Sequence, residues 1–87
     1  PLADILIVFG SASDAPVYSK IMQGLKEKGM GAELRICSAH RTPKQLDSII
    51  GKSNAKLIIA GAGLSAALPG VIASKTVRPV IGVPVSG

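Results

Sequence analysis

Short apolar segments recur along the chain and predict four β-strands, near residues 4–9, 32–37, 55–60 and 79–83. The first contains the continuous branched run Ile5-Leu6-Ile7-Val8-Phe9, which is typical of a strand buried on both faces. The second alternates apolar and polar positions with a period of two. This alternation predicts a strand nearer the edge of the sheet, with one face in contact with water.

The segments between these strands have helical periodicity. Apolar residues recur at helical spacing over residues 15–28, and Gly29 is expected to end this helix. A shorter helix is expected over Gln45–Ile50, ending near Gly51, and a third over Leu68–Lys75. Strands that alternate with helices predict right-handed crossovers and therefore an α/β fold with a parallel sheet.

Three loops are expected to meet at one edge of this sheet. In an open sheet of the flavodoxin-like order 2-1-3-4, ligands bind beyond the carboxyl ends of the strands, where the order of the strands reverses. That rule brings together Gly10–Asp14, Ser38–Pro43 and Gly61–Ala67. Because all three loops are small, polar or glycine-rich, the pattern predicts a ligand site there.

The hexapeptide Ser38-Ala39-His40-Arg41-Thr42-Pro43 follows the second strand and holds the only histidine of the chain. Pro43 suits the first turn of a helix, with Thr42 as its expected N-cap. The turn therefore presents an imidazole at His40, which exchanges protons near neutral pH, beside a fixed cation at Arg41. The alternative is an ordinary capped turn with an exposed histidine, which is the commoner situation for a lone histidine.

The other two loops suit an anionic ligand. Gly10–Asp14 carries the hydroxyls of Ser11 and Ser13 and backbone N–H groups at a helix N-terminus, where an anion is favoured. Asp14 is then either the N-cap or an acceptor for sugar hydroxyls, although serine and aspartate before a helix are commonly simple caps. The Gly61–Ala67 loop offers backbone donors, and a tight turn between packed elements is at least as good an interpretation of it.

Composition and charge narrow the possible functions. The chain of 87 residues is expected to form a single domain, residues 1–87, and 47% of its residues are hydrophobic, as in globular proteins. Its formal net charge is +5, yet it has no Trp, and Phe9 and Tyr18 stand alone as aromatics. The stacking surface of a nucleic-acid binder is therefore missing. A solvated surface and a small anionic ligand explain the cations better than nucleic acid does.

Other classes of protein are disfavoured as well. No apolar run approaches the roughly 20 residues that span a bilayer, and a single cysteine, Cys37, fits a reducing cytoplasm. One histidine, one cysteine and scattered carboxylates do not predict a metal site. A hydrolase triad of Ser11 or Ser38, His40 and Asp14 lacks the supporting Gly-x-Ser-x-Gly motif. The P-loop and the dinucleotide-binding glycine fingerprint are also missing.

Five motifs occur along the chain in the order and spacing of a known enzyme family, which the chain therefore resembles. They are Gly10-Ser11-Ala12-Ser13-Asp14, Ser38-Ala39-His40-Arg41-Thr42-Pro43, Ala60-Gly61-Ala62-Gly63, Leu68-Pro69-Gly70-Val71 and Pro79-Val80-Ile81-Gly82-Val83-Pro84-Val85. Together they resemble the PurE family, the N5-carboxyaminoimidazole ribonucleotide mutases of purine biosynthesis, over essentially the whole chain. With Arg41 and Pro43, the hexapeptide resembles that of the mutase class; in the related aminoimidazole ribonucleotide carboxylases, lysine usually follows the histidine.

The resemblance implies a flavodoxin-like three-layer α/β/α sandwich, usually assembled into an octamer. It implies transfer of a carboxylate from N5 to C4 of an aminoimidazole ribonucleotide, without ATP, metal or biotin. By position, it implies that the 5′-phosphate is held by Ser11, Ser13, Ser38 and Arg41. Asp14 then binds the ribose hydroxyls, and His40 is the general acid/base. Backbone donors of Gly61, Ala62 and Gly63 hold CO2 or carboxylate between the two half-reactions.

The chain departs from the family in two ways. Ala67 stands where the family usually carries a second histidine before Leu-Pro-Gly, and the chain has only about half the family's usual length. The later glycine-rich loop, the fifth strand and the C-terminal helices are missing. We therefore expect an exposed edge at the fourth strand, and a fragment, a truncated form or one copy within a longer protein. The alternative function is a PurE-like nucleotide-binding or assembly domain with weak or no catalysis.

Overall fold

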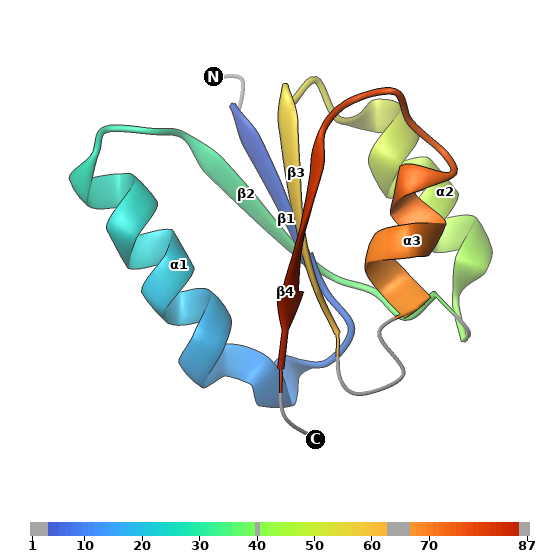
Figure 1. The fold of residues 1–87 in the computed structure, drawn as a ribbon, viewed down its shortest axis with the longest axis horizontal. Coiled ribbons are helices and arrows are strands. Elements are labelled where there is room, and N and C mark those ends of the chain that lie inside the picture. The colour runs from blue at the N-terminus through green and yellow to red at the C-terminus, as the bar shows by residue number, and fades with distance from the viewer. Residues whose placement is uncertain (1–3, 40, 63–66, 86–87) are drawn as a thin grey trace.

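The computed structural model describes residues 4–39, 41–62 and 67–85 (Figure 1). Over these residues the elements are β1 (Ile5–Phe9), a short 3-10 helix η1 (Ala12–Asp14), α1 (Ala15–Glu27), β2 (Ala32–Ile36), α2 (Pro43–Lys52), β3 (Leu57–Ala62), α3 (Ala67–Ala73) and β4 (Val80–Pro84). The strands form one sheet in the order β2-β1-β3-β4, and all neighbouring pairs are parallel. The predicted order and the parallel pairing are confirmed.

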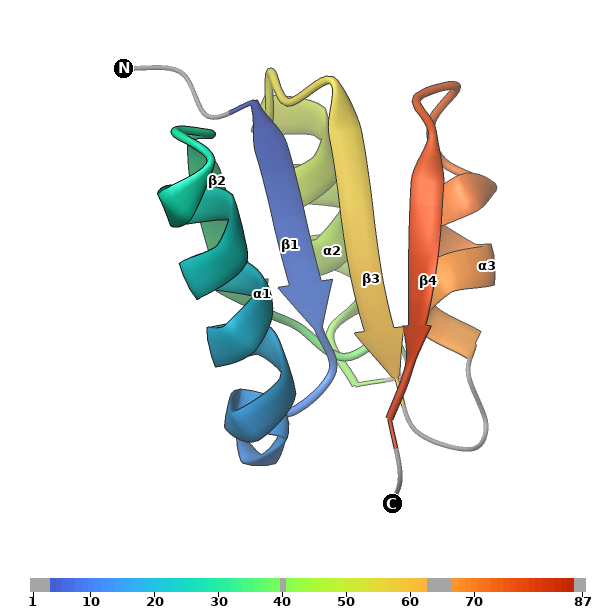
Figure 2. The same cartoon turned by 60° about the vertical axis from the view of Figure 1, so that its left-hand side comes forward.

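The helices cover both faces of the sheet, which gives the three layers that the resemblance implies. α1 lies on one face, and α2 and α3 lie together on the other (Figures 1 and 2). Side chains of β1 alternate between these faces: Ile5, Ile7 and Phe9 pack on the α1 side, and Leu6 and Val8 pack on the opposite side. All five are buried, so β1 is the doubly buried strand that its apolar run predicts.

β2 lies at one edge of the sheet and pairs only with β1 among the described strands. Its apolar residue Leu34 packs toward α1. Glu33 and Arg35, which line a hollow beside α2, form an ion pair with 3.4 Å between Arg35 Nη2 and Glu33 Oε2. Charged side chains at an open edge discourage pairing with another strand. The prediction of a wetter edge strand is confirmed.

Several element boundaries differ from the predicted ones. α2 begins at Pro43 and continues through Gly51, because proline at the first helical position is already set for the helix and one glycine costs only about 1 kcal/mol. β3 runs two residues beyond the predicted end, because Gly61 and Ala62 still pair with β4. The predicted stop of α1 is confirmed, since Gly29 has a φ of 72° just after the helix.

The sheet is incompletely covered on the α1 side of β4. Ile81 is 50% exposed, and Val83 is half-buried. β4 is also the last strand in the order of the described sheet, which agrees with the expected exposed edge at the fourth strand. None of the described helices is long and apolar enough to cross a membrane.

Candidate functional site

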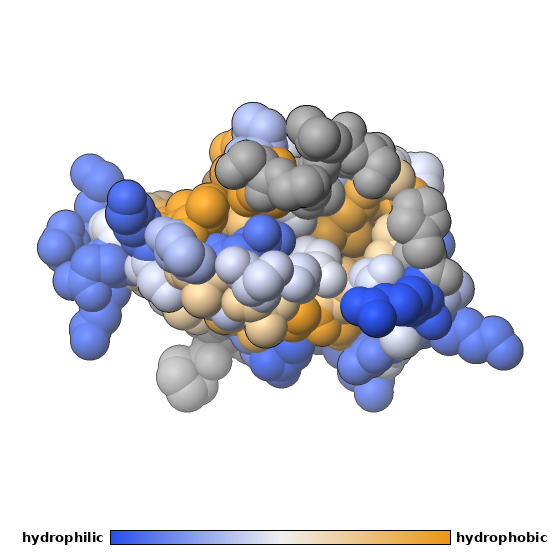
Figure 3. Space-filling view, turned by 90° about the horizontal axis from the view of Figure 1, so that it is seen from below, coloured by the Kyte–Doolittle hydropathy of each residue, from blue (hydrophilic) through white to orange (hydrophobic). Residues whose placement is uncertain are grey.

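The three predicted loops start side by side at the carboxyl edge of the sheet. The N–H of Cys37 donates to Phe9 O at 2.9 Å, and the N–H of Gly10 donates to Gly61 O at 3.3 Å. These bonds tie the ends of β2 and β3 to the end of β1, at the point where the order of the strands reverses. Figure 3 looks onto this end of the molecule, where hydrophilic and hydrophobic residues both reach the surface.

The serine loop, residues 10–14, is held by its own hydrogen bonds. Ser11 is the N-cap of η1, and its Oγ accepts from the N–H of Ser13 at 3.1 Å. The two hydroxyl oxygens, Ser11 Oγ and Ser13 Oγ, lie 2.7 Å apart and hydrogen-bond to each other. Ser13 is exposed and Ser11 is half-buried. The loop therefore presents a pair of adjacent hydroxyls in one fixed turn.

Asp14 occupies the N-cap position of α1, but its side chain makes no capping hydrogen bond. The capping of this turn falls to Ser11, because the 3-10 helix η1 precedes α1 and has its own N-cap. The sequence left two roles open for Asp14, and the structure does not show the capping hydrogen bond that the first role requires. Asp14 is half-buried and is the last residue of the serine loop.

The turn after β2 is also held by local hydrogen bonds. Ser38 Oγ accepts from the N–H of Arg41 at 3.1 Å, and Ser38 O accepts from the N–H and from the hydroxyl of Thr42, each at 3.1 Å. Arg41 is exposed. His40, the predicted acid/base, lies outside the described residues. The turn thus holds the Ser38 side chain against the backbone of Arg41.

The prediction that Thr42 is the N-cap residue of α2 is confirmed, but its side chain does not cap the helix. The hydroxyl turns instead to Ser38 O and lies 3.3 Å from the thiol sulfur of Cys37. Cys37 is buried in the core on the α2 side. Sequence reasoning used Cys37 only as a redox marker and missed that it anchors the start of the turn.

The glycine-rich segment begins inside the sheet. Gly61 and Ala62 are the last residues of β3, opposite Val83 and Pro84. A side chain at Gly61 would overlap the Phe9 ring, because its Cβ would lie 2.6 Å from Cδ2 of that ring. Glycine is therefore required at this position for close packing. Gly63 lies outside the described residues, and Ala67 begins α3.

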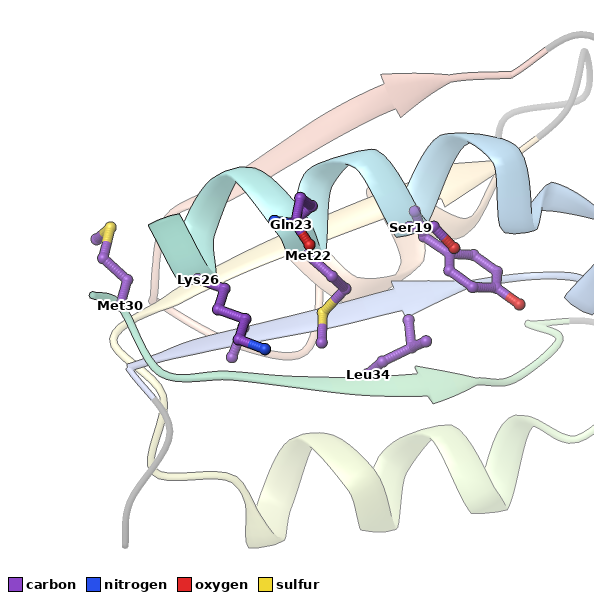
Figure 4. Close-up of a pocket in the computed structure, with 8 residues that line it drawn as sticks. Ser19, Met22, Gln23, Lys26, Met30 and Leu34 are labelled. Atoms are coloured by element: carbon purple, nitrogen blue, oxygen red, sulfur yellow. The ribbon is translucent and has the colours of Figure 1, made fainter. Parts of the chain in front are cut away.

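A separate groove of about 410 Å³ lies between α1 and β2. Figure 4 shows Met22 of α1 and Leu34 of β2 in this groove, with Lys26 at its rim. The groove runs along the sheet edge, and the hydroxyl pair lies beyond the start of α1. Tyr18 also lines the groove and connects it to the serine loop through a hydrogen bond to Ala12 O.

The open parallel sheet of order β2-β1-β3-β4, with helices on both faces, defines a flavodoxin-like α/β fold. The family model described as AIR carboxylase matches residues 4–87. The chain belongs to this family.

Individual relatives agree with the family match. A protein of Methanocaldococcus jannaschii named N5-carboxyaminoimidazole ribonucleotide mutase is 51% identical over 81 residues, which cover 93% of this chain and 52% of that protein. The phosphoribosylaminoimidazole carboxylase of Saccharomyces cerevisiae is 49% identical over 93% of this chain and 15% of its own length. The crystal structure of Treponema denticola PurE superposes with a TM-score of 0.88, at 32% identity, over 95% of this chain and 55% of that one.

Proposed function

We propose that the chain takes part in the N5-carboxyaminoimidazole ribonucleotide mutase reaction of purine biosynthesis, as a single domain in the cytoplasm. The observation that best supports this function is that three loops meet at the end of β1, where backbone hydrogen bonds join Cys37 to Phe9 and Gly10 to Gly61. Relatives at 51% and 49% identity bear mutase names, which supports the same reaction. The chain spans only about half the length of these relatives (52% and 46%).

The 5′-phosphate of the ribonucleotide is bound by the serine loop and by the turn after β2. The adjacent hydroxyls of Ser11 and Ser13 and the hydroxyl of Ser38 supply neutral donors, and Arg41 supplies a charged, two-pronged donor. The start of α1 favours an anion at the same place. The Asp14 carboxylate, which makes no capping bond, accepts hydrogen bonds from the ribose hydroxyls.

His40 carries the proton in this reaction. The bond from N5 to the carboxylate breaks and N5 gains a proton; the carboxylate carbon then bonds to C4, and C4 loses its proton. A single group that gives one proton and takes one back balances both steps, and an imidazole does so near neutral pH. The neighbouring residues Ser38 and Arg41 lie at the carboxyl edge, which supports this role.

The migrating carboxylate is held by backbone donors of Gly61, Ala62 and Gly63 between the two half-reactions. The position of Gly61 beside the start of the serine loop supports this assignment. Because the substrate itself brings the carboxylate, the reaction as proposed needs no ATP, metal or biotin to activate bicarbonate.

Arg41→Ala is expected to weaken binding of aminoimidazole ribonucleotide by about 10- to 100-fold, since a hydrogen bond to a charged group contributes roughly 1.5–3 kcal/mol. Titration calorimetry on the wild-type chain and the variant measures this difference. Lys56→Ala is the matched control, because it also removes one exposed positive charge, but just before β3, at the opposite end of the sheet. Equal affinity for wild type and Arg41→Ala refutes the phosphate role of Arg41.

We also propose that the chain forms homo-oligomers, as the resemblance implies. The exposed apolar side chain of Ile81 and the incompletely covered face of β4 support self-association. Sedimentation velocity at low micromolar concentration is expected to give species larger than the 8.8 kDa of one chain. A well-folded monomer at that concentration contradicts the proposal.

A further inference from the structure

The aromatic ring of Phe9 connects the end of β3 to the start of α1. Phe9 is fully buried, and its ring fills the space where a side chain of Gly61 would otherwise lie. The ring also packs edge-on against Tyr18 of α1, with 5.4 Å between the ring centroids and 69° between the ring planes. Such edge-to-face packing fixes the orientation of both rings. The position of the Tyr18 ring is therefore set by the core of the sheet.

The hydroxyl of Tyr18 reaches the serine loop. It donates to the carbonyl of Ala12 at 3.3 Å, and Ala12 stands between Ser11 and Ser13. The backbone N–H of Ala15, the first residue of α1, donates to the same carbonyl. A phenylalanine would pack equally well against Phe9, so packing alone does not require a hydroxyl here. Among the residues that the structure describes, the Tyr18 hydroxyl is hydrogen-bonded to the serine loop alone.

We propose that Tyr18 is a positioning residue for the phosphate-binding loop, an inference that rests on the proposed function. The contacts from Gly61 through Phe9 and Tyr18 to Ala12 transmit the fixed geometry of the sheet to the hydroxyls of Ser11 and Ser13. Donors that are held in place before the phosphate arrives lose less conformational entropy on binding. Tyr18 thereby strengthens phosphate binding through the loop, without touching the ligand.

The test is Tyr18→Phe, which keeps the ring and removes only the hydroxyl. The expected result is a 3- to 10-fold loss of affinity for aminoimidazole ribonucleotide in titration calorimetry, the range for one neutral hydrogen bond. The amide of Ser13, which is bonded to Ser11 Oγ, is expected to exchange its hydrogen faster by a similar factor. Amides of β1 are expected to keep their exchange rates, since the core packing is unchanged.

Ser74→Ala is the matched control. Ser74 follows α3, and its hydroxyl donates to the backbone carbonyl of Val71 within that helix, so the variant also removes one bond from a hydroxyl to a carbonyl. This variant is expected to bind the ribonucleotide like wild type. If Tyr18→Phe also binds like wild type, or if its Ser13 amide exchanges at the wild-type rate, the positioning role is overturned.

The two proposals fail in different ways. A folded wild-type chain that binds no ribonucleotide overturns the proposed function, and with it the phosphate part of this inference. The exchange rate of the Ser13 amide in Tyr18→Phe then decides alone whether Tyr18 holds the loop.

Discussion

His40→Asn is expected to lower the turnover of the proposed mutase reaction by at least about 100-fold, because general acid/base catalysis contributes roughly 10²–10⁴ in rate. Asparagine is polar and of similar size, but it does not exchange a proton near neutral pH. Ribonucleotide affinity is therefore expected to stay close to that of wild type. Rates of carboxylate transfer at saturating substrate, measured together with calorimetric affinities, check both parts.

Arg41→Ala is expected to change the opposite quantity from His40→Asn, namely the substrate affinity and not the turnover. Loss of a phosphate contact weakens substrate binding, whereas loss of the acid/base lowers the rate with bound substrate. The two variants are thus expected to separate affinity from turnover. A turnover of His40→Asn within a few-fold of wild type excludes His40 as the proton carrier. A large loss of affinity in the same variant shows instead that His40 binds the substrate.

The sheet could be predicted from the sequence because its signals are local. The branched run Ile5–Phe9 requires burial on both faces, and the alternation in Ala32–Ile36 requires one wet face. Short helical segments between strands leave the right-handed crossover as the usual connection. These constraints favour an order with the second strand at the edge and the first strand inside the sheet, and the observed order β2-β1-β3-β4 places the three loops at one edge.

The packing that shapes the site could not be predicted in the same way. The Phe9 ring covers Gly61 because the register of β1 and β3 sets these two residues opposite each other, and it meets Tyr18 because α1 packs on the same face of the sheet. Registers depend on contacts between distant segments, so the sequence pattern presents Gly61 as a loop residue. Likewise, Thr42 is the N-cap residue that its sequence pattern predicts, but its hydroxyl bonds to Ser38 O and contacts Cys37 Sγ in place of the helix.

Arg78 is a second residue whose role depends on distant contacts. Its guanidinium donates to Ile50 O at 2.8 Å and to Ser53 O and Ala55 O, each at 3.0 Å. These carbonyls belong to the end of α2 and to the segment that leads into β3. Carbonyl groups in the last turn of a helix have no partner within the helix, and a cation there is favourable. One side chain therefore joins α2, the start of β3 and the segment before β4.

Arg78→Ala is expected to lower the free energy of unfolding by about 2–3 kcal/mol, since hydrogen bonds to a charged group contribute roughly 1.5–3 kcal/mol. The whole stability of such domains is only about 5–15 kcal/mol, so the loss is large. Urea unfolding followed by circular dichroism measures it as a lower midpoint at unchanged slope.

Two matched variants decide whether the hydrogen bonds of Arg78 cause this loss. Arg78→Lys keeps the charge but has no planar fork to reach several carbonyls at once, so it is expected to recover less than half of the stability. Arg35→Ala removes an equal charge from an exposed ion pair and is expected to cost less than about 1 kcal/mol. If Arg78→Ala unfolds at the same urea concentration as Arg35→Ala, the three carbonyl contacts contribute nothing to stability. Ribonucleotide affinity should not change in folded Arg78→Ala, because Arg78 lies before β4, at the end of the sheet opposite the serine loop.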